Sequence, residues 1–245
     1  GAAFARDALA ALLRPGSVHV GAVHVGAVEE TGIAGLTLDL ARLPATASLG
    51  VFLLPPGQGS RIEDRSRLVQ PDGVVVTGVA GAADPYGSPE AAANELAGVF
   101  TGMTANGTAI LNRDDPHFFR LLAAARTAGL TRILSFGDHE DADARVSLCS
   151  LHATGSTVSA TVRGERIRYR LPVPGRRHAT SSLAALLAAD VLGADLATAA
   201  GALDTVIETP SALGTVPASG TSPGKSPGAA LTTRTQAATA AAPKS

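Results

Sequence analysis

The first 136 residues alternate short apolar runs with helical segments, and this alternation limits the fold more than any other feature of the sequence. The apolar runs are rich in valine and leucine and lack regular polar positions, which is typical of strands buried on both faces. Alternation of strands and helices predicts an α/β fold in which a mostly parallel sheet is flanked by helices. The predicted strands are residues 17–25, 48–54, 73–79, 107–111 and 131–136.

Helical spacing and boundary residues predict the segments between and after these strands. Ser88 with Pro89 and Glu90 behind it is a typical helix start, and Asp115 with Pro116 indicates a second one. The predicted helices are residues 2–13, 36–43, a polar helix ending at residue 68, and residues 88–101, 115–128, 178–193 and 195–204.

The pattern changes after residue 140, where three short runs alternate apolar and polar residues and are separated by glycine-containing turns. This alternation predicts a small antiparallel meander over residues 144–151, 156–163 and 166–173. The single cysteine, Cys149, falls in the first of these strands and is expected to behave as a small hydrophobic residue. One cysteine also excludes an internal disulfide and a multi-cysteine metal site.

The composition beyond residue 205 differs from that of the rest of the chain. From Thr209 onward the chain is mostly Pro, Gly, Ser, Thr and Ala, without an acidic or aromatic residue. Such a segment buries too little apolar surface to offset its chain entropy. We therefore predict one folded domain over residues 1–205 and a disordered low-complexity tail over residues 206–245. A linker or a partner-docking arm is the functional alternative for the tail.

Charge and hydropathy exclude several classes of partner. The net charge is −1 and the isoelectric point is about 6.7, so no basic excess indicates binding to nucleic acid or to an anionic membrane. No stretch reaches the length of about 18 uncharged apolar residues that a membrane span needs. The sequence therefore predicts a protein of the bacterial cytoplasm without nucleic acid or membrane partners.

The most specific motif is the run from Leu111 to Phe118, LNRDDPHF, where a predicted strand ends and a helix begins. Ligands of open α/β sheets bind at the carboxyl ends of strands. Asn112 can hydrogen-bond an adenine edge, and Asp115 can accept hydrogen bonds from ribose hydroxyls. The structural alternative is that Asn112 shapes the turn and Asp115 caps the following helix.

This run belongs to a long ordered series of motifs over residues 1–205. The motifs are GLTLDLARL from Gly35, GVF from Gly50, GTAILNRDDP from Gly107, LSFG from Leu134, ADAR from Ala142 and LPVPGR from Leu171. The series resembles the Mur ligases, and most closely the branch that adds D-alanyl-D-alanine to the UDP-muramoyl tripeptide (MurF). The resemblance implies a P-loop-like central domain, in which ATP phosphorylates a carboxylate and an amine then displaces the phosphate. It also implies nucleotide binding by Asn112, Asp115 and Arg176.

Most positions that match the family's catalytic groups hold residues that cannot perform the same chemistry. Methyl groups neither bind β- and γ-phosphates nor ligate Mg²⁺, and apolar replacements fill space that a hydrated metal would occupy. His178 is a weak shifted substitute for the family's histidine after Arg176. The replaced positions are Ala2 for the phosphate-binding Lys, Ala3 for the magnesium-binding hydroxyl, Leu53 for a metal-site Glu, Ala83 for a His, Leu96 for a modified Lys, and Thr31-Gly32 for an Asn-Asn pair.

The sequence therefore leaves two main functions open. In the first, the chain is a non-catalytic pseudoenzyme or scaffold, linked to peptidoglycan precursor synthesis through a protein partner. It then has no catalytic residue and no metal site, and ATP is the candidate ligand of Asn112, Asp115 and Arg176. In the second, it is an active ATP-dependent ligase that adds D-alanyl-D-alanine to the UDP-muramoyl tripeptide. A decayed remnant is a third reading, although the mutually consistent strands, caps and turns argue against it.

Overall fold

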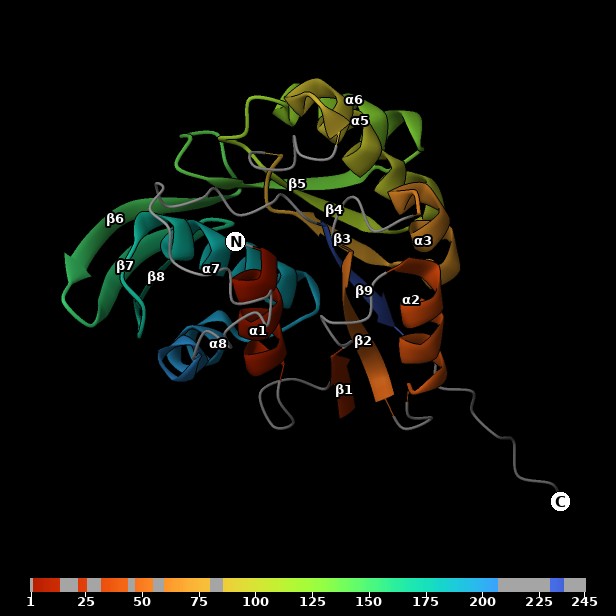
Figure 1. Cartoon of the computed structure of the whole chain (residues 1–245). Coiled ribbons are helices and arrows are strands. Elements are labelled where there is room, and N and C mark those ends of the chain that lie inside the picture. The colour runs from red at the N-terminus through yellow and green to blue at the C-terminus, as the bar shows by residue number, and fades with distance from the viewer. Residues whose placement is uncertain are drawn as a thin grey trace, which may run out of the picture.

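The computed structural model describes residues 2–13, 22–25, 32–43, 47–54, 60–79, 86–206 and 230–235. A nine-stranded sheet runs through these residues (Figure 1). In order across the sheet, the strands are β1 (Ala22–Val25), β2 (Ala47–Leu54), β9 (Ala230–Thr235), β3 (Gly73–Val76), β4 (Thr108–Asn112), β5 (Arg132–Gly137), β6 (Ala144–His152), β7 (Gly155–Val162) and β8 (Glu165–Leu171).

The sheet is mostly parallel, with an antiparallel meander at one side. Strand β1 pairs parallel with β2, and β3, β4, β5 and β6 follow one another in parallel. Strands β6, β7 and β8 then pair antiparallel. This arrangement confirms the predicted fold class and the predicted meander. Cys149 lies in β6 as expected and is a free thiol.

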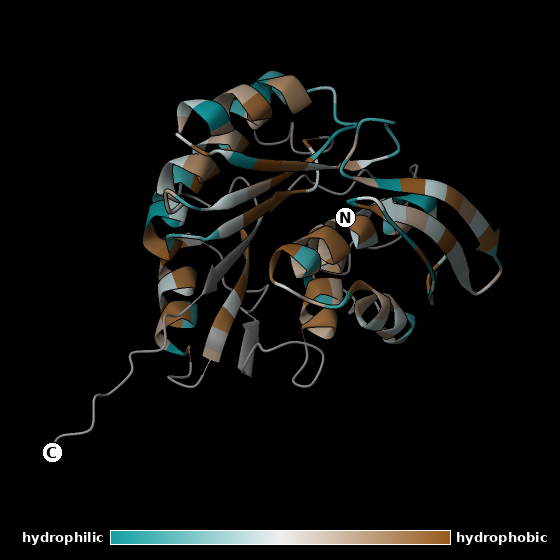
Figure 2. Cartoon of the chain, turned by 180° about the vertical axis from the view of Figure 1, so that it is seen from behind, coloured by the Kyte–Doolittle hydropathy of each residue, from teal (hydrophilic) through white to brown (hydrophobic). Residues whose placement is uncertain are grey.

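Helices cover both faces of the sheet, and each layer encloses its own apolar cluster. In Figure 2 brown segments are frequent in the strands and in the helices of both layers, which also carry teal segments. The first layer holds α1 (Ala2–Leu12), α7 (Arg176–Val191), α8 (Leu196–Ala202) and the short 3-10 helix η2 (Leu203–Thr205). The second holds α2 (Gly32–Ala41), α3 (Ile62–Val69), α5 (Pro89–Ala97), the 3-10 helix η1 (Gly98–Gly102) and α6 (Phe118–Thr127).

The two predicted helix starts have different outcomes. The Ser88 side chain accepts a hydrogen bond of 3.1 Å from the backbone N–H of Ala91, and Pro89 opens α5, as predicted. Helix α6 begins later than predicted, at Phe118, and its N-cap residue is His117. The Asp115 carboxylate reaches the His117 N–H at 2.8 Å, so it stabilises the turn before the helix.

Strand β9 lies in the segment predicted to be disordered, residues 206–245, and for Ala230–Thr235 that prediction is wrong. It runs antiparallel between β2 and β3 and pairs with both, over residues 49–54 and 73–76. The reason is physical: β2 and β3 do not pair with each other, so their facing backbone groups need a strand between them. Threonine and leucine suit that position. Residues 207–229 and 236–245 lie outside the described residues.

None of the helices in the described part of the chain is both long and apolar enough to cross a membrane.

Candidate nucleotide site at the strand ends

The carboxyl ends of β3, β4 and β5 carry the polar residues that the sequence singled out, and the start of α7 lies beside them. Asn112 ends β4, where its side chain donates a hydrogen bond of 2.9 Å to the carbonyl oxygen of Thr77, beyond β3. Its Oδ1 atom accepts a 3.0 Å hydrogen bond from the backbone N–H of Asp114. Asn112 therefore ties two neighbouring strand ends together.

Asp115 is buried at the same edge and is engaged by backbone groups through both carboxylate oxygens. Oδ2 accepts a hydrogen bond of 2.6 Å from the N–H of Val79, and Oδ1 accepts the one from His117. Gly78 has a φ of +150°, and a Cβ atom there would lie 3.1 Å from Asp115 Oδ2. The close approach of carboxylate and backbone at this point needs a glycine.

Asp114 makes the corresponding connection to β5, and the sequence analysis did not assign it a role. Its carboxylate accepts hydrogen bonds from the backbone N–H groups of Asp138 at 2.7 Å and His139 at 3.0 Å. Gly137 has a φ of +153°, and a Cβ atom there would lie 2.5 Å from Asp114 Oδ2. The available sequence signal was a glycine at a strand end followed by an acidic loop.

Arg176, the first residue of α7, reaches back over this edge. Its Nε atom donates a hydrogen bond of 2.7 Å to Asp138 Oδ2, and 59% of its side chain is exposed. The hydrogen bond and the charge of Asp138 raise the pKa of Arg176. Nearby, the His178 ring stacks edge-on against Phe4 of α1 at 5.1 Å, and its Nδ1 atom lies 3.1 Å from the Pro174 carbonyl oxygen.

The three predicted nucleotide ligands thus lie around one edge of the sheet, but they differ in what they can offer a ligand. Both oxygens of Asp115 already accept backbone hydrogen bonds, and Asn112 uses its amide and its carbonyl within the chain. Arg176 keeps further guanidinium N–H groups exposed beside Asp138. Among these three, Arg176 is therefore the group best able to meet an anion.

The sequence model of the Mur ligase middle domain matches residues 48–189, which is more than half of the chain. The chain belongs to the Mur ligase family. One relative is the UDP-N-acetylmuramate--L-alanine ligase of Cutibacterium acnes, 30% identical over 185 residues, covering 66% of this chain and 37% of that protein. The protein of the same name from Paenarthrobacter aurescens is 35% identical over 121 residues, covering 49% and 25%. The chain thus spans well under half the length of these relatives.

Solved structures of the Mur ligases share the fold. MurF from Acinetobacter baumannii superposes with a TM-score of 0.75 at 17% identity, over 89% of this chain and 46% of that one. MurF from Thermotoga maritima in complex with ADP gives 0.69 at 17% identity, over 86% and 47%. This likeness concerns the fold. The sequence relatives and the structural neighbours named here represent different branches of the family.

The positions that the sequence analysis aligned with the Mur ligase phosphate and metal groups lie on both faces of the sheet. Ala2 is buried at the start of α1. Alternation along β2 places the half-buried Leu53 on the same face as Val51, which belongs to the cluster that α1 joins. Leu96 is fully buried in the cluster of the opposite face. Leu53 and Leu96 therefore lie toward opposite faces of the sheet. Ala83 and Thr31 lie outside the described residues, as does the side chain of Ala3.

The described residues do not fit a magnesium ion. Among the described residues, no group of three or more His, Cys, Asp or Glu side chains is arranged to hold a metal. Leu96 is 0% exposed among apolar neighbours, where a hydrated cation has no ligand. In the acidic loop after β5, Asp138 is paired with Arg176, and His139 faces Asp141 at 3.8 Å.

Proposed function

We propose that this chain is a Mur ligase middle domain without phosphoryl transfer, which serves as a non-catalytic scaffold in peptidoglycan precursor synthesis. Phosphoryl transfer depends on cations that neutralise the developing charge. The observation that supports the proposal most directly is Leu96, a fully buried leucine at the position of the family's modified lysine. Ala2, at the position of the phosphate-binding lysine, supports it further.

The residues at the strand ends support a structural role for the candidate nucleotide site. Asn112, Asp114 and Asp115 hold the loops after β3, β4 and β5 together through hydrogen bonds within the chain. A domain that keeps this network keeps its shape without a nucleotide. We propose that ATP binds weakly at most, through Arg176, and that Mg²⁺ does not strengthen it.

The second candidate function is an active ligase, and the preserved fold favours it. Within this alternative, two branches of the family are candidates for the substrate. The fold neighbours named above are MurF proteins, whereas the sequence relatives are named UDP-N-acetylmuramate--L-alanine ligase. The alternative requires the phosphate and metal ligands to come from a partner chain, or from residues of this chain other than those aligned with the family's ligands.

The deciding experiment is calorimetric titration of the purified chain with ATP, with and without Mg²⁺. The expected result is no binding, or weak binding that Mg²⁺ leaves unchanged. Arg176→Ala should abolish any residual binding, whereas Arg126→Ala, which removes an exposed arginine of α6, should leave it unchanged. Tight binding that requires Mg²⁺ would contradict the proposal.

A second assay separates the ligase branches. Phosphate release is measured with UDP-muramoyl tripeptide plus D-alanyl-D-alanine, and with UDP-N-acetylmuramate plus L-alanine. No release above the level without amine is expected in either mixture. Amine-dependent release in one of them would establish the active ligase and identify its branch.

A further inference from the structure

The meander has one face in the core and one face in solvent, and the exposed face is basic. Along β8, Ile167, Tyr169 and Leu171 are buried in the cluster that includes residues of α7 and α8. The alternate residues, Arg166, Arg168 and Arg170, are exposed. Because side chains of a strand alternate between its faces, the three guanidinium groups project from the same side, about 7 Å apart along the strand.

The neighbouring strands add hydroxyl groups and a fourth arginine to this surface. In β7, Thr157, Ser159 and Thr161 stand opposite Arg170, Arg168 and Arg166 in the register. Arg145 of β6 stands opposite Thr161. Guanidinium and hydroxyl groups are hydrogen-bond donors that suit a carboxylate or a phosphate. We call the surface formed by the four arginines and the three hydroxyl residues the arginine face.

The positive charge of the arginine face is local and is not neutralised within the described structure. The strands β6, β7 and β8 contain four arginines and one acidic residue, Glu165, although the whole chain has a net charge of −1. None of the four arginines forms an ion pair with a described residue. By contrast, Arg163, in the turn before β8, is paired with Asp190 at 2.8 Å.

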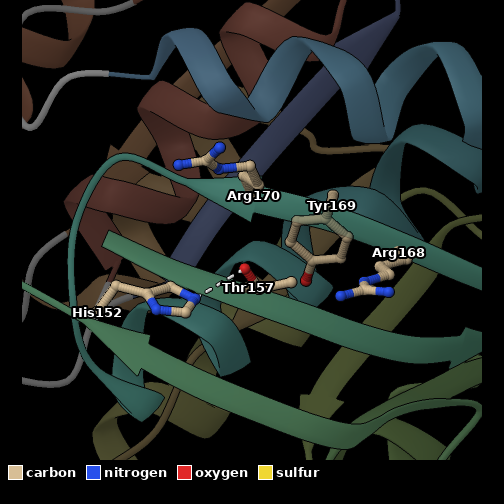
Figure 3. A pocket seen from close by; sticks show the side chains of 5 residues that line it. All are labelled: His152, Thr157, Arg168, Tyr169 and Arg170. Atoms are coloured by element: carbon tan, nitrogen blue, oxygen red, sulfur yellow. Dashed lines mark hydrogen bonds between the residues drawn. The ribbon is translucent and has the colours of Figure 1, made fainter. Parts of the chain in front are cut away.

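A shallow pocket hollows one end of this surface (Figure 3). Its volume is about 430 Å³, and it is lined by His152, Thr157, Arg168, Tyr169 and Arg170. The His152 Nε2 atom lies 3.0 Å from Thr157 Oγ1, which links the end of β6 to β7. The pocket therefore combines two unpaired guanidinium groups with a histidine and a hydroxyl.

We propose that the arginine face binds an acidic, extended segment of a protein partner that lies along β8. Strand β8 is the last strand of the sheet, and within the described chain its backbone pairs with β7 alone. An extended segment with carboxylates at every second residue has the same spacing of about 7 Å as the arginines. Opposite charges that face each other across neighbouring strands stabilise such a pairing.

The surface chemistry favours a polypeptide over other anions. Single-stranded nucleic acid binds to basic grooves that also carry aromatic side chains for base stacking. In β6, β7 and β8 the one exposed ring is His152, at the end of the pocket, because Tyr169 is buried with its hydroxyl 2.8 Å from Ser182 Oγ of α7. Insertion into a membrane surface would need an apolar face. The outward residues of β7 and β8 are hydroxyl residues and arginines, and the exposed Leu148 of β6, opposite Ser159, is one apolar side chain beside them. Binding of an acidic segment to the arginine face does not require that the chain binds ATP.

The test is fluorescence anisotropy of a labelled twelve-residue peptide, (Glu-Thr)₆, titrated with the full chain at low salt. The comparison peptide has the same composition in blocks, six glutamates followed by six threonines. We expect the alternating peptide to bind several-fold tighter than the block peptide. Binding should weaken as salt shortens the Debye length below about 10 Å.

Charge-reversal variants locate the interaction. Arg168→Glu with Arg170→Glu should weaken binding of the alternating peptide about tenfold, because two attractive pairs become repulsive. The matched control reverses two exposed arginines elsewhere, Arg126→Glu with Arg132→Glu, and should change the affinity less than about twofold. Circular dichroism melting checks that each variant folds, and Arg168→Gln with Arg170→Gln replaces the reversal if it does not.

Several outcomes would overturn the proposal. Equal losses in the two charge-reversal variants would show that attraction is non-specific. Equal binding of the two peptides would contradict the match in spacing. Tighter binding of a twelve-nucleotide single-stranded DNA, or of vesicles containing phosphatidylserine, would assign the arginine face to a different class of partner. Absence of peptide binding would leave the arginines as a device that prevents edge-to-edge aggregation.

Discussion

The Asp115 carboxylate accepts a 2.6 Å hydrogen bond from the backbone N–H of Val79, which joins the loop after β4 to the end of β3. The bond is buried, and the same carboxylate also holds the N–H of His117. It is a stabilising contact at the edge of the sheet where the sequence analysis predicted nucleotide binding. Because both oxygens of the Asp115 carboxylate accept backbone hydrogen bonds, the stability of the fold depends on a residue that was predicted to bind a nucleotide.

Asp115→Ala should lower the free energy of unfolding by about 1–3 kcal/mol, because it leaves buried N–H groups without acceptors. Urea denaturation followed by circular dichroism measures the change. The control is Glu140→Ala, an exposed carboxylate in the loop after β5, which should change the stability by less than about 0.5 kcal/mol. Equal stability of the Asp115 variant and the wild type would show that the network is dispensable.

Tyr169 should make the stability depend on alkaline pH. Its hydroxyl is buried 2.8 Å from Ser182 Oγ, and burial raises its pKa above the ordinary value of 10.0. The folded state therefore holds the phenolic proton at pH values where the unfolded state has lost it. This contribution is fully present below pH 10 and is lost as the pH rises further, with a slope of up to about 1.4 kcal/mol per pH unit.

Tyr169→Phe tests this expectation. Chemical denaturation between pH 8 and pH 11 should show a shallower fall in stability for the variant than for the wild type. Ser182→Ala removes the hydrogen-bond partner but leaves the phenol buried, so it should keep the pH dependence of the wild type. Parallel curves for Tyr169→Phe and the wild type would mean that the phenol does not titrate between the folded and unfolded states in this range.

Gly137→Ala should destabilise the protein more than a glycine substitution in open space. The added methyl group would meet Asp114 Oδ2 at 2.5 Å and also require a positive φ. Gly129, after α6, also has a positive φ, of +88°, but no atom within 4 Å of the added carbon. We expect Gly129→Ala to cost about 1 kcal/mol and Gly137→Ala at least about 2 kcal/mol in thermal or chemical denaturation. Similar losses would show that Asp114 moves aside easily.

Strand β9 should be required for a stable sheet. A chain that ends at Val206 lacks β9 and exposes facing edges of β2 and β3, whereas a chain that ends at Gln236 retains it. The shorter chain should melt at a lower temperature and associate at higher protein concentration, as light scattering would report. The longer chain should match the chain of 245 residues. Identical melting of the two truncated chains would contradict the described role of β9.

Local patterns in the sequence predicted most of the fold. The strands from β2 to β5 follow from runs of apolar residues and those from β6 to β8 from alternation of apolar and polar residues, and Ser88 with Pro89 marked the start of α5 correctly. Strand β9 was not predicted, because its pairing depends on a gap between β2 and β3. The composition of the tail carries no information about that gap. The late start of α6 has a similar origin, because Asp115 is directed toward Val79 by a contact 36 residues away.

The candidate site was predictable in its place but not in its contacts. Asn112 and Arg176 were found because they match family motifs. The pairing of Arg176 with Asp138, and of Asp114 with the loop that follows Gly137, joins residues separated by more than twenty positions. Which of the available partners a carboxylate takes is decided by the packing of strand ends, so that information appears only in three dimensions.

The position of β9 also bears on how the chain folds during its synthesis. A chain emerges from the ribosome with its N-terminal part first, so Ala230–Thr235 emerges after every other strand of the sheet. Until then β1 and β2 cannot join the strands from β3 to β8, and both parts present unpaired backbone to the surrounding solution. Completion of the sheet must wait until Thr235 has been synthesised, 64 residues after the end of β8, which lengthens the period in which a nascent molecule needs protection by chaperones.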